Sequence, residues 1–477
     1  TAISVAGRSE IVPGKARCGH PHRCVRGDTF PAPVTSVTMT GTNITSPFRE
    51  TFGAFTEACR GITKGENADY IPALANVDPN LWATAVMSPD GDLYAFGDID
   101  HKFTIQSISK PLVYGIAIEE LGIEKVTERV GVEPSGDAFN EISLDKDGRP
   151  VNPMINAGAL AVHGLLQEHV GSSAEKLILE VMSKLANREL DADMQIGEEE
   201  REAGFRNRAI ANLLRSTDVI TCDPLEVFNG YSWQCSININ VCDLATIGAT
   251  LANGGVNPLS GERVFSDETS QWVLSVMSTS GMYNAAGNWM NKVGIPAKSG
   301  VAGGILGVIP GQLSLASFSP PLDEFGNSER GNAFFDKASN ELGLHMMRVT
   351  GRPQGAVRQR AQVDFDEDGV QDTTLLRLYG DIDFCSYEPI DREVTQGATS
   401  GTQMFVDLVE VRSLAPRVKK MLEQLLESAA GETTVFVHDP ADLLDHDVCA
   451  APQWVDQAEV RSYESPRPAR RKPRQLL

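Results

Sequence analysis

The sequence predicts an α/β protein of the α+β kind, with a mixed-sheet domain that carries an inserted helical domain and a small second α/β module. Two observations predict the first domain: β-rich runs lie on both sides of a long stretch, about residues 126–257, and helical periodicity dominates within it. A third observation predicts the module, because strand, strand, helix and strand patterns follow one another near the C-terminus.

The chain has 477 residues and divides into five expected segments. Residues 1–45, rich in Gly, Pro, Thr and Ser, predict a disordered extension. Residues 46–350 form the main domain, and residues 351–372, with glycine and several arginines, predict a linker. Residues 373–445 form the small module, and the basic, proline-rich residues 446–477 predict a disordered tail.

The individual elements follow from local patterns. Residues 48–58 have apolar spacing typical of a helix, and residues 81–99 predict a hairpin whose turn contains Pro89-Asp90-Gly91. Residues 103–122 predict an amphipathic helix with Ser107 near its first turn. Later strands are expected at 293–300, 301–311, 312–320, 373–382, 402–411 and 433–439, and later helices at about 332–350 and 416–429.

Charge and cysteine content limit the possible partners and location. The net charge of −22 argues against binding to nucleic acid or an anionic membrane, because like charges repel. The same charge is typical of surfaces that stay hydrated in concentrated salt. No apolar run approaches the roughly 20 residues that cross a bilayer, and the eight scattered cysteines indicate reduced thiols in a cytoplasmic protein. The first residue is Thr1 and not Met, so a signal peptide that was removed by processing stays an open alternative.

Two segments invite a metal hypothesis, and neither fits well. Cys18 and Cys24 bracket two histidines, but their spacing matches no common zinc pattern. Residues 364–369 match the first half of an EF-hand loop, yet the twelfth position is Leu375 instead of a bidentate glutamate. We therefore expect no metal and no cofactor.

The segment QSISK contains an S-x-x-K tetrad formed by Ser107 and Lys110. Positions i and i+3 share one face of a helix, so the lysine amine can lie beside the serine hydroxyl. A buried lysine that is partly neutral can accept the serine proton, and a helix start can stabilise developing negative charge. Alone, the tetrad is weak, since S-x-x-K also occurs on solvated helix faces.

A later K-S-G segment, Lys298-Ser299-Gly300, lies between two β-rich runs. An S-x-x-K helix followed by a K-[ST]-G strand is the arrangement of penicillin-binding proteins and serine β-lactamases. The pair therefore indicates serine acyl transfer, with a penicillin-recognising acylase or peptidase as one reading.

Seven segments in order extend the similarity: GENADYIPALA, FTIQSISK, PMINAGA, EREAGFRN, YSWQCSI, ATLANGGVNPLSGERV and GMYNAAG…GIPAKSGVAGG. With them, residues 50–350 resemble the bacterial and mitochondrial-type glutaminases. The resemblance implies a serine β-lactamase-like fold, hydrolysis of L-glutamine to L-glutamate and ammonia, and a dimer or tetramer. It makes residues 46–350 a glutaminase catalytic domain.

Carried over residue by residue, the resemblance implies the following roles. Ser107 attacks the side-chain amide and Lys110 accepts its proton, while Tyr231 and Tyr283 relay a proton to the leaving ammonia. The backbone N–H groups of Ser107 and Val301 form the oxyanion hole. The residues implied to hold the α-amino and α-carboxylate ends of glutamine are Tyr70, Asn156, Glu200 and Asn207.

Each residue also has a plainer interpretation. Glu200 lies in the charge run GEEERE, which is usually a solvated helix face, and Asn156 can be a turn residue. Tyr231 and Tyr283 can be half-buried core aromatics. Cys235 suggests a thiol mechanism, but a small packed residue is the better interpretation.

The C-terminal module resembles a STAS domain, a regulatory fold, across about residues 373–444. The segment that should carry a phosphorylatable serine after an aspartate reads Asp407 to Ser413 here, without that arrangement. A packing or oligomer role is therefore expected. A third hypothesis for the whole chain is a regulatory binding protein with a dead N-terminal enzyme.

Overall fold

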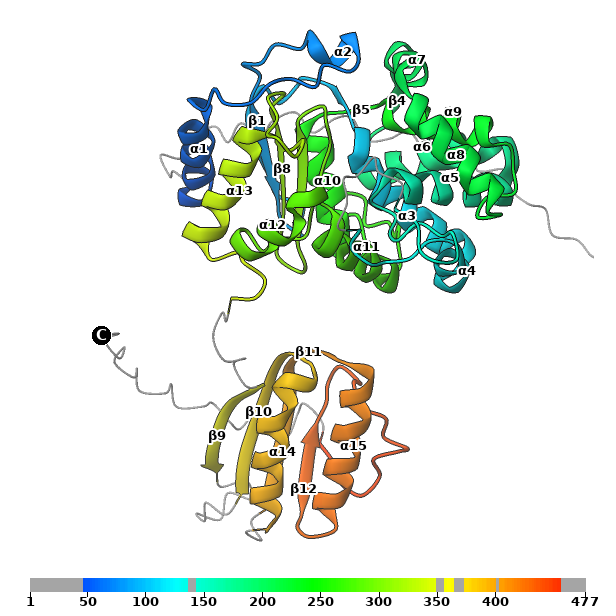
Figure 1. Ribbon diagram of the computed structural model, residues 1–477. Helices are drawn as coiled ribbons and strands as arrows, with labels where there is room; N and C mark the ends of the chain where they lie inside the picture. The colour runs from blue at the N-terminus through cyan, green and yellow to red at the C-terminus, as the bar shows by residue number, and fades with distance from the viewer. Residues whose placement is uncertain (1–45, 136–142, 349–355, 364–372, 400–402, 456–477) are drawn as a thin grey trace, which may run out of the picture. The chain divides into compact units, whose positions relative to one another are not determined.

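The computed structural model describes residues 46–135, 143–348, 356–363, 373–399 and 403–455 (Figure 1). These residues belong to two compact units, one within residues 1–348 and the other within residues 349–477. The expected N-terminal extension, the Cys18–Cys24 segment and the acidic turn at 364–369 lie outside the described residues. In the described part of the chain, no helix is long and apolar enough to cross a membrane.

The first unit is built on a five-stranded antiparallel sheet in the order β2-β1-β8-β7-β6. Its strands are β1 (Ala83–Met87), β2 (Leu93–Gly97), β6 (Ala297–Ser299), β7 (Gly304–Ile309) and β8 (Leu313–Phe318). The predicted hairpin is confirmed as β1 and β2, and Gly91 provides the positive φ of +93° that its turn needs. The strands on the two sides of the helical stretch thus join in one sheet.

Helices cover both faces of this sheet (Figure 1). On one face, α1 (Pro47–Arg60) and α13 (Glu329–Leu342) enclose a core that contains Phe52, Trp82 and Phe334. On the other face, α10 (Val241–Ala252) packs against the sheet with Leu244 and Ile247 in a second, larger core. Burial of these apolar side chains fixes the sheet between two helical layers.

The stretch predicted as helical, about residues 126–257, is mainly helical, but its last helix, α10, packs on the main sheet. The helical elements before α10 are α4 (Ile123–Arg129), α5 (Asn156–Val170), η2 (Gly171–Ser173), α6 (Ala174–Ala186), α7 (Met194–Ala203), α8 (Phe205–Ser216) and α9 (Pro224–Cys235). A small sheet in the order β3-β5-β4 joins them to the main sheet domain. Its strands are β3 (Phe103–Thr104), β5 (Ile237–Ile239) and β4 (Asp191–Ala192).

The helix expected at 103–122 differs from the prediction. The segment begins with β3 and the 3-10 turn η1 (Gln106–Ile108), and only then does α3 (Ser109–Leu121) begin. Residues 109–118 are buried on every face, so α3 is a core helix and the amphipathic interpretation is wrong. A helix enclosed on all sides is apolar all round, and the polar Ser109 and Lys110 are buried with it.

Other helices of the first unit were missed or shifted. The short α2 (Pro72–Ala75) precedes the sheet, and α11 (Asp267–Ser280), η3 (Tyr283–Ala285) and α12 (Ala286–Lys292) lie before β6, in residues for which no element was predicted. The helix predicted at 332–350 is α13, which begins after its N-cap Ser328 and ends at Leu342. Gly343, with a φ of +71°, closes it in the left-handed conformation.

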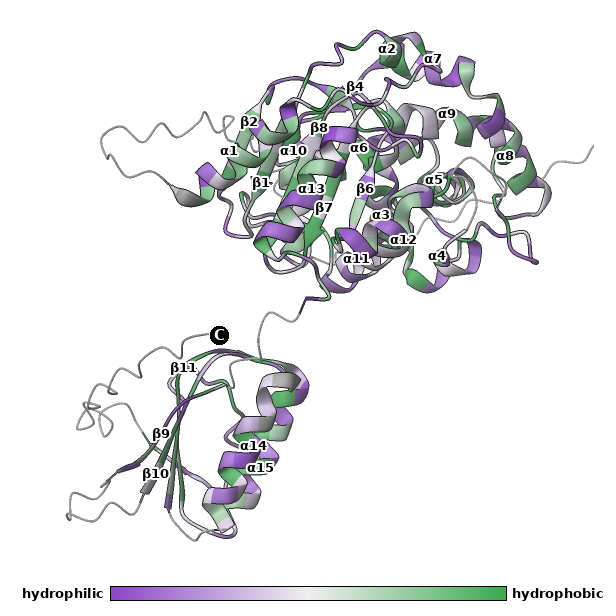
Figure 2. Ribbon diagram, turned by 60° about the vertical axis from the view of Figure 1, so that its left-hand side comes forward, coloured by the Kyte–Doolittle hydropathy of each residue, from purple (hydrophilic) through white to green (hydrophobic). Residues whose placement is uncertain are grey.

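The second unit has a sheet in the order β13-β12-β11-β10-β9 with two helices, α14 (Phe384–Thr399) and α15 (Pro416–Ala430). The strands are β9 (Val357–Val363), β10 (Thr373–Ile382), β11 (Gln403–Leu414), β12 (Val435–His438) and β13 (Gln453–Trp454). Strands β10 to β13 pair in parallel, and β9 is antiparallel to β10. Figure 2 shows hydrophobic and hydrophilic residues alternating along α14 and α15, whose apolar faces pack on the sheet.

Three elements of this unit were not expected. Strand β9 lies inside the segment predicted as a linker at 351–372, and β13 lies inside the predicted tail at 446–477. Helix α14 occupies residues that were given no element. Strands β9 and β13 form the two edges of the sheet. Their residues have the composition of a linker and a tail, so the prediction from composition was wrong at these positions.

Candidate active site

Ser107 lies in the tight turn η1, between β3 and α3, and the residue is 7% exposed. The preceding residue, Gln106, has a φ of +50°, a left-handed conformation that costs a residue with a side chain about 1–3 kcal/mol. The Ser109 hydroxyl donates to the Gln106 carbonyl at 2.7 Å and accepts from the Gln234 amide at 2.9 Å. The turn that presents Ser107 is thus held in a strained form by buried polar contacts.

Lys110 stands three residues after Ser107 and is buried. Its Nζ donates to Asn156 Oδ1 at 2.6 Å and to the Met154 carbonyl at 3.2 Å. Burial lowers the pKa of Lys110 to about 8, because the charged ammonium loses its solvation. A lysine with this pKa is partly neutral near neutral pH, as a general base must be.

The two candidate tyrosines lie in different surroundings. Tyr283 lies in η3 with a φ of +52°, and its phenol donates to the Ser299 carbonyl at 3.2 Å and is hydrogen-bonded to Ser107. Burial raises the pKa of Tyr283 to about 12. Tyr231 on α9 reaches Asn156 Oδ1 at 3.5 Å, and burial together with Cys235 raises its pKa well above the usual value. Both phenols are therefore neutral donors in the resting protein.

Glu200 is turned away from the solvated face of α7. Its Oε1 accepts from the Tyr70 hydroxyl at 2.7 Å and from the Gln106 amide at 3.0 Å, although the Tyr70 side chain is 46% exposed. Its neighbours Glu198 and Glu202 are exposed, so only part of the charge run is a solvated surface. Burial raises the pKa of Glu200, and a paired cation would relieve that penalty.

Asn156 and Asn207 form a second polar group of the site. Asn156 is the first residue of α5 and is buried, and its amide donates to Asn207 Oδ1 at 2.8 Å. Because Asn156 also accepts from Lys110, it connects the candidate base to the candidate recognition residues. The structure thus joins Lys110, Asn156, Asn207 and Tyr231 in one network.

The K-S-G segment forms strand β6 and the turn after it, close to η1. A Cβ on Gly300 would lie 3.0 Å from the Ile105 carbonyl and 3.3 Å from Gln106 Cβ, so glycine permits this approach. The Ser299 hydroxyl donates to Asn327 Oδ1 at 2.6 Å. Val301 follows Gly300 directly in the chain.

Three residues of the site were not assigned roles from sequence: Gln106, Lys298 and Asn327. Gln106 stands directly before the nucleophile, and Lys298 belongs to the K-S-G motif, so adjacency to a motif was the available signal. Asn327 has no such signal, since only the fold brings its loop to Ser299. Cys235 is buried beside Tyr231, and burial raises its pKa to about 12, so it is a thiol and a poor nucleophile.

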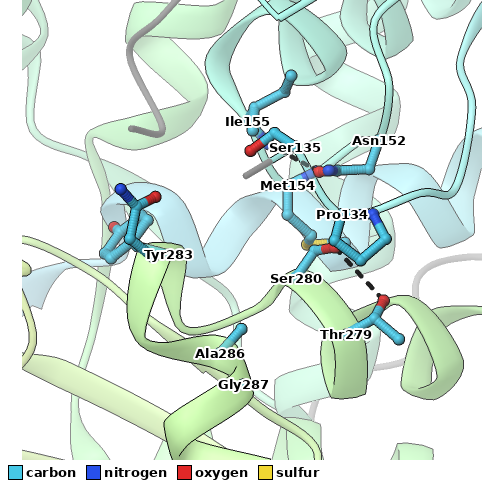
Figure 3. A pocket seen from close by; sticks show the side chains of 11 residues that line it. Pro134, Ser135, Asn152, Met154, Ile155, Thr279, Ser280, Tyr283, Ala286 and Gly287 are labelled. Carbon is cyan, nitrogen blue, oxygen red and sulfur yellow. Dashed lines mark hydrogen bonds between the residues drawn. The ribbon is translucent and has the colours of Figure 1, made fainter. Parts of the chain in front are cut away.

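Two pockets adjoin the site. The larger, about 210 Å³, has Tyr283 in its wall, and Figure 3 shows residues of the loop before α5, such as Asn152 and Met154, facing residues of α11, η3 and α12. The smaller, about 100 Å³, includes Val301. Ser107 lines neither pocket. Among the described residues, no group of three or more His, Cys, Asp or Glu side chains could hold a metal ion.

Comparison with known proteins finds similarity to glutaminases. A family model described as Glutaminase matches residues 65–347. The glutaminase of Corynebacterium efficiens is 41% identical over 430 residues, which cover 88% of this chain and 100% of that protein. The glutaminase of Trichormus variabilis is 45% identical over 288 residues, which cover 60% of this chain and 86% of that protein.

Solved structures also resemble this chain in fold and sequence. A crystal structure of Mglu is 38% identical with a TM-score of 0.76 and covers 84% of this chain and 100% of Mglu. A Bacillus glutaminase, crystallised in 4.3 M NaCl, is 32% identical with a TM-score of 0.58 and covers 63% of this chain and 99% of that one. These matches and the mixed α/β fold define the class of protein as an amidohydrolase. The chain belongs to the glutaminase family.

Proposed function

We propose that the chain hydrolyses L-glutamine to L-glutamate and ammonia through a glutamyl ester on Ser107. The overall reaction is that of the family to which the chain belongs. The observation that carries the ester mechanism is the buried Lys110, three residues after Ser107, whose Nζ is held by Asn156 and whose lowered pKa suits a base.

In the first half-reaction, Ser107 Oγ bonds to the side-chain amide carbon of glutamine while its proton passes to Lys110. The carbonyl oxygen becomes an oxyanion, and the N–H groups of Ser107 and Val301 are proposed to bind it, each contributing roughly 3–4 kcal/mol. The carbon–nitrogen bond then breaks. The leaving nitrogen takes one proton, which Tyr283 or Tyr231 relays from Lys110, and departs as ammonia.

In the second half-reaction, water replaces ammonia. Lys110, again neutral, accepts a proton from water as the water oxygen bonds to the ester carbon. The bond to Ser107 Oγ breaks, Ser107 regains its proton, and glutamate leaves. No metal or organic group takes part in any of these proposed steps.

The recognition residues explain a preference for an amino acid substrate. The α-ammonium of glutamine can pair with Glu200, and the amides of Asn156 and Asn207 can donate to its α-carboxylate. A simple amide would leave Glu200 without its cation in a largely closed site, which is costly. Mglu has been crystallised in a glutamate form, which supports binding of the product in this family.

One side-by-side measurement tests this function. Ammonia release from glutamine, asparagine and a chromogenic β-lactam would be compared for the purified protein. We expect release from glutamine and negligible turnover of the β-lactam. Turnover of the β-lactam without ammonia from glutamine would favour the penicillin-recognising acylase, which the K-S-G strand β6 suggests.

For the second unit, we propose a STAS-like module with a packing role in a cytoplasmic homo-oligomer. Its parallel strands with two helices on one face support the first part, and the five described free thiols support the location. The acidic surface supports the expectation of no nucleic acid and no membrane partner. Light scattering at several protein concentrations would show a monomer if the oligomer proposal is wrong.

A further inference from the structure

Lys298 on β6 is fully buried, with 0% of its surface exposed, and no step of the proposed reaction uses it. Burial of a lysine is costly unless the ammonium gains partners that replace water. Its Nζ donates to the Ser299 carbonyl at 2.6 Å and lies 3.9 Å from the centroid of the Tyr283 ring. The Lys298 amine therefore faces the ring of one of the two candidate proton carriers.

Tyr283 shares this carbonyl. Its phenol donates to the Ser299 oxygen at 3.2 Å and is hydrogen-bonded to Ser107, so the phenol joins the nucleophile to the partner of Lys298. The backbone of Tyr283 is in the left-handed conformation with a φ of +52°. A residue keeps such a conformation only where its surroundings hold it, and the contact with Lys298 is one such restraint.

We propose that Lys298 is the positioning residue that makes Tyr283, and not Tyr231, the proton carrier of the reaction. Its Nζ, bound to the Ser299 carbonyl beside the ring, holds the phenol between Ser107 and that carbonyl, in position to protonate the leaving nitrogen. The proton that Lys110 took from Ser107 then restores the phenol. The inference rests on the proposed glutamine hydrolysis.

The surroundings of Tyr231 are less favourable to a phenolate. Its hydroxyl lies 3.5 Å from Asn156 Oδ1, and both Cys235 and Glu200 add to the effect of burial in raising its pKa. Tyr283 also faces Cys235, but its hydroxyl is hydrogen-bonded to Ser107 and the Lys298 amine lies at its ring. The difference between the two sites is thus a direct hydrogen bond to the nucleophile and a lysine at the ring face.

Lys110 also influences Lys298. Burial and the nearby Lys110 lower the pKa of Lys298 well below its usual value, which favours its neutral amine. A neutral amine can still donate to the Ser299 carbonyl. Lys298 therefore acts through this hydrogen bond and through its place at the Tyr283 ring.

The test compares Lys298→Met with Lys298→Arg in the full chain, with ammonia release from glutamine as the assay. Lys298→Met keeps the length and packing of the side chain and removes its amine. We expect kcat to fall about 100-fold, as when one preorganised hydrogen-bond donor is removed, with KM changed by less than about threefold. Lys298→Arg should recover part of kcat. The control is Lys292→Met, at an exposed ion pair with Asp336, and it should behave like wild type.

A double-mutant cycle decides whether Lys298 acts through Tyr283. In a Tyr283→Phe background, Lys298→Met should change kcat by less than about threefold, because the group it assists is already gone. An equal 100-fold fall in both backgrounds, or a normal kcat in Lys298→Met, would overturn the proposal. Wild-type protein that releases no ammonia from glutamine would instead contradict the proposed function.

Thermal unfolding would show whether Lys298→Met folds. If it does not, the phenylalanine variants of the two tyrosines test the proposal. The proposal requires Tyr283→Phe to lower kcat more than Tyr231→Phe does, with little change in KM. The reverse order would overturn it.

Discussion

At the scale of residues, the burial of Lys110 has the largest chemical consequence. In water its ammonium would hold a proton at neutral pH, but inside the protein the charged form loses solvation and its pKa falls to about 8. The side-chain oxygen Oδ1 of Asn156, at 2.6 Å, orients the Lys110 Nζ without adding a counter-charge. Geometry and burial together make Lys110 a base that is available near neutral pH.

A pH profile follows from this pKa. Lys110 must be neutral to accept the Ser107 proton, and it is neutral above its folded pKa. We expect kcat/KM to rise about tenfold per pH unit below about pH 8 and to level off above it. Ammonia release at low glutamine concentration, in buffers of constant ionic strength, measures it. A profile that stays flat from about pH 6 to pH 8 would exclude Lys110 as the base.

Part of the site was predictable from residue spacing, and part was not. The i, i+3 spacing placed Ser107 and Lys110 on one turn without any knowledge of the fold. The contact of Tyr70 with Glu200 joins residues 130 positions apart, so no local pattern encodes it, and only motif order suggested both residues. The left-handed φ of Gln106 and Tyr283 was also unpredictable, because it is imposed by tertiary contacts.

At the scale of elements, the crossing of α5 and α9 positions the site. Asn156 begins α5 and Tyr231 lies on α9, and the two helices pack closely at Gly230. A Cβ on Gly230 would lie 2.2 Å from Nε2 of the buried His163, whose Nδ1 is hydrogen-bonded to Gln234. The spacing of the two helices therefore depends on the absence of one side chain.

Gly230→Ala should separate these helices. Because His163 has little room to move, we expect a loss of about 1–3 kcal/mol in the free energy of unfolding and a lower kcat, since Asn156 and Tyr231 move apart. Denaturant unfolding and ammonia release measure the two effects. The control is Gly287→Ala on α12, where a Cβ meets nothing within 4 Å. Equal behaviour of the two variants would show that the crossing is not tightly packed.

Element prediction failed where sequence signals conflicted with packing. Helix α11 contains several Ser and Thr residues of modest helix propensity, and α14 contains Pro389 and Gly397, so neither has a strong helical pattern. Their apolar residues, such as Val273 and Ile390, are buried in the cores, and this packing stabilises the helices. By contrast, the β1–β2 hairpin and α15 have clear local signals and were predicted.

At the scale of the whole molecule, the two units differ in how many of the similar solved structures contain them. The match with Mglu covers 84% of 477 residues, more than the 348 residues before the second unit, so it extends into that unit. The Bacillus glutaminase is covered over 99% of its length by 63% of this chain. A family member as short as the Bacillus glutaminase has little room for a second unit.

Residues 46–348 alone should therefore hydrolyse glutamine. All nine candidate site residues lie in this range, which has its own hydrophobic cores. We expect a truncated protein to fold and to retain most of kcat, as measured by circular dichroism and ammonia release. A folded but inactive truncation would show that the second unit contributes to the site.

The net charge of −22 leads to a second prediction at this scale. Carboxylates on the surface remain hydrated in concentrated salt, and screening reduces their mutual repulsion. We expect most of the glutaminase activity to persist in molar NaCl, which ammonia release at increasing NaCl concentration would measure. If molar NaCl abolishes the activity as fully as it does in a less acidic homologue, the prediction of salt tolerance is contradicted.

The measurement that most directly tests the central claim is glutamine hydrolysis by Ser107→Ala. Without the nucleophile, we expect ammonia release to fall at least about 10⁴-fold while the thermal unfolding of the protein is unchanged. The matched control is Ser109→Ala, which removes the other serine of the tetrad and should keep far more activity. Near-normal hydrolysis by Ser107→Ala would show that the reaction does not proceed through an ester on this serine.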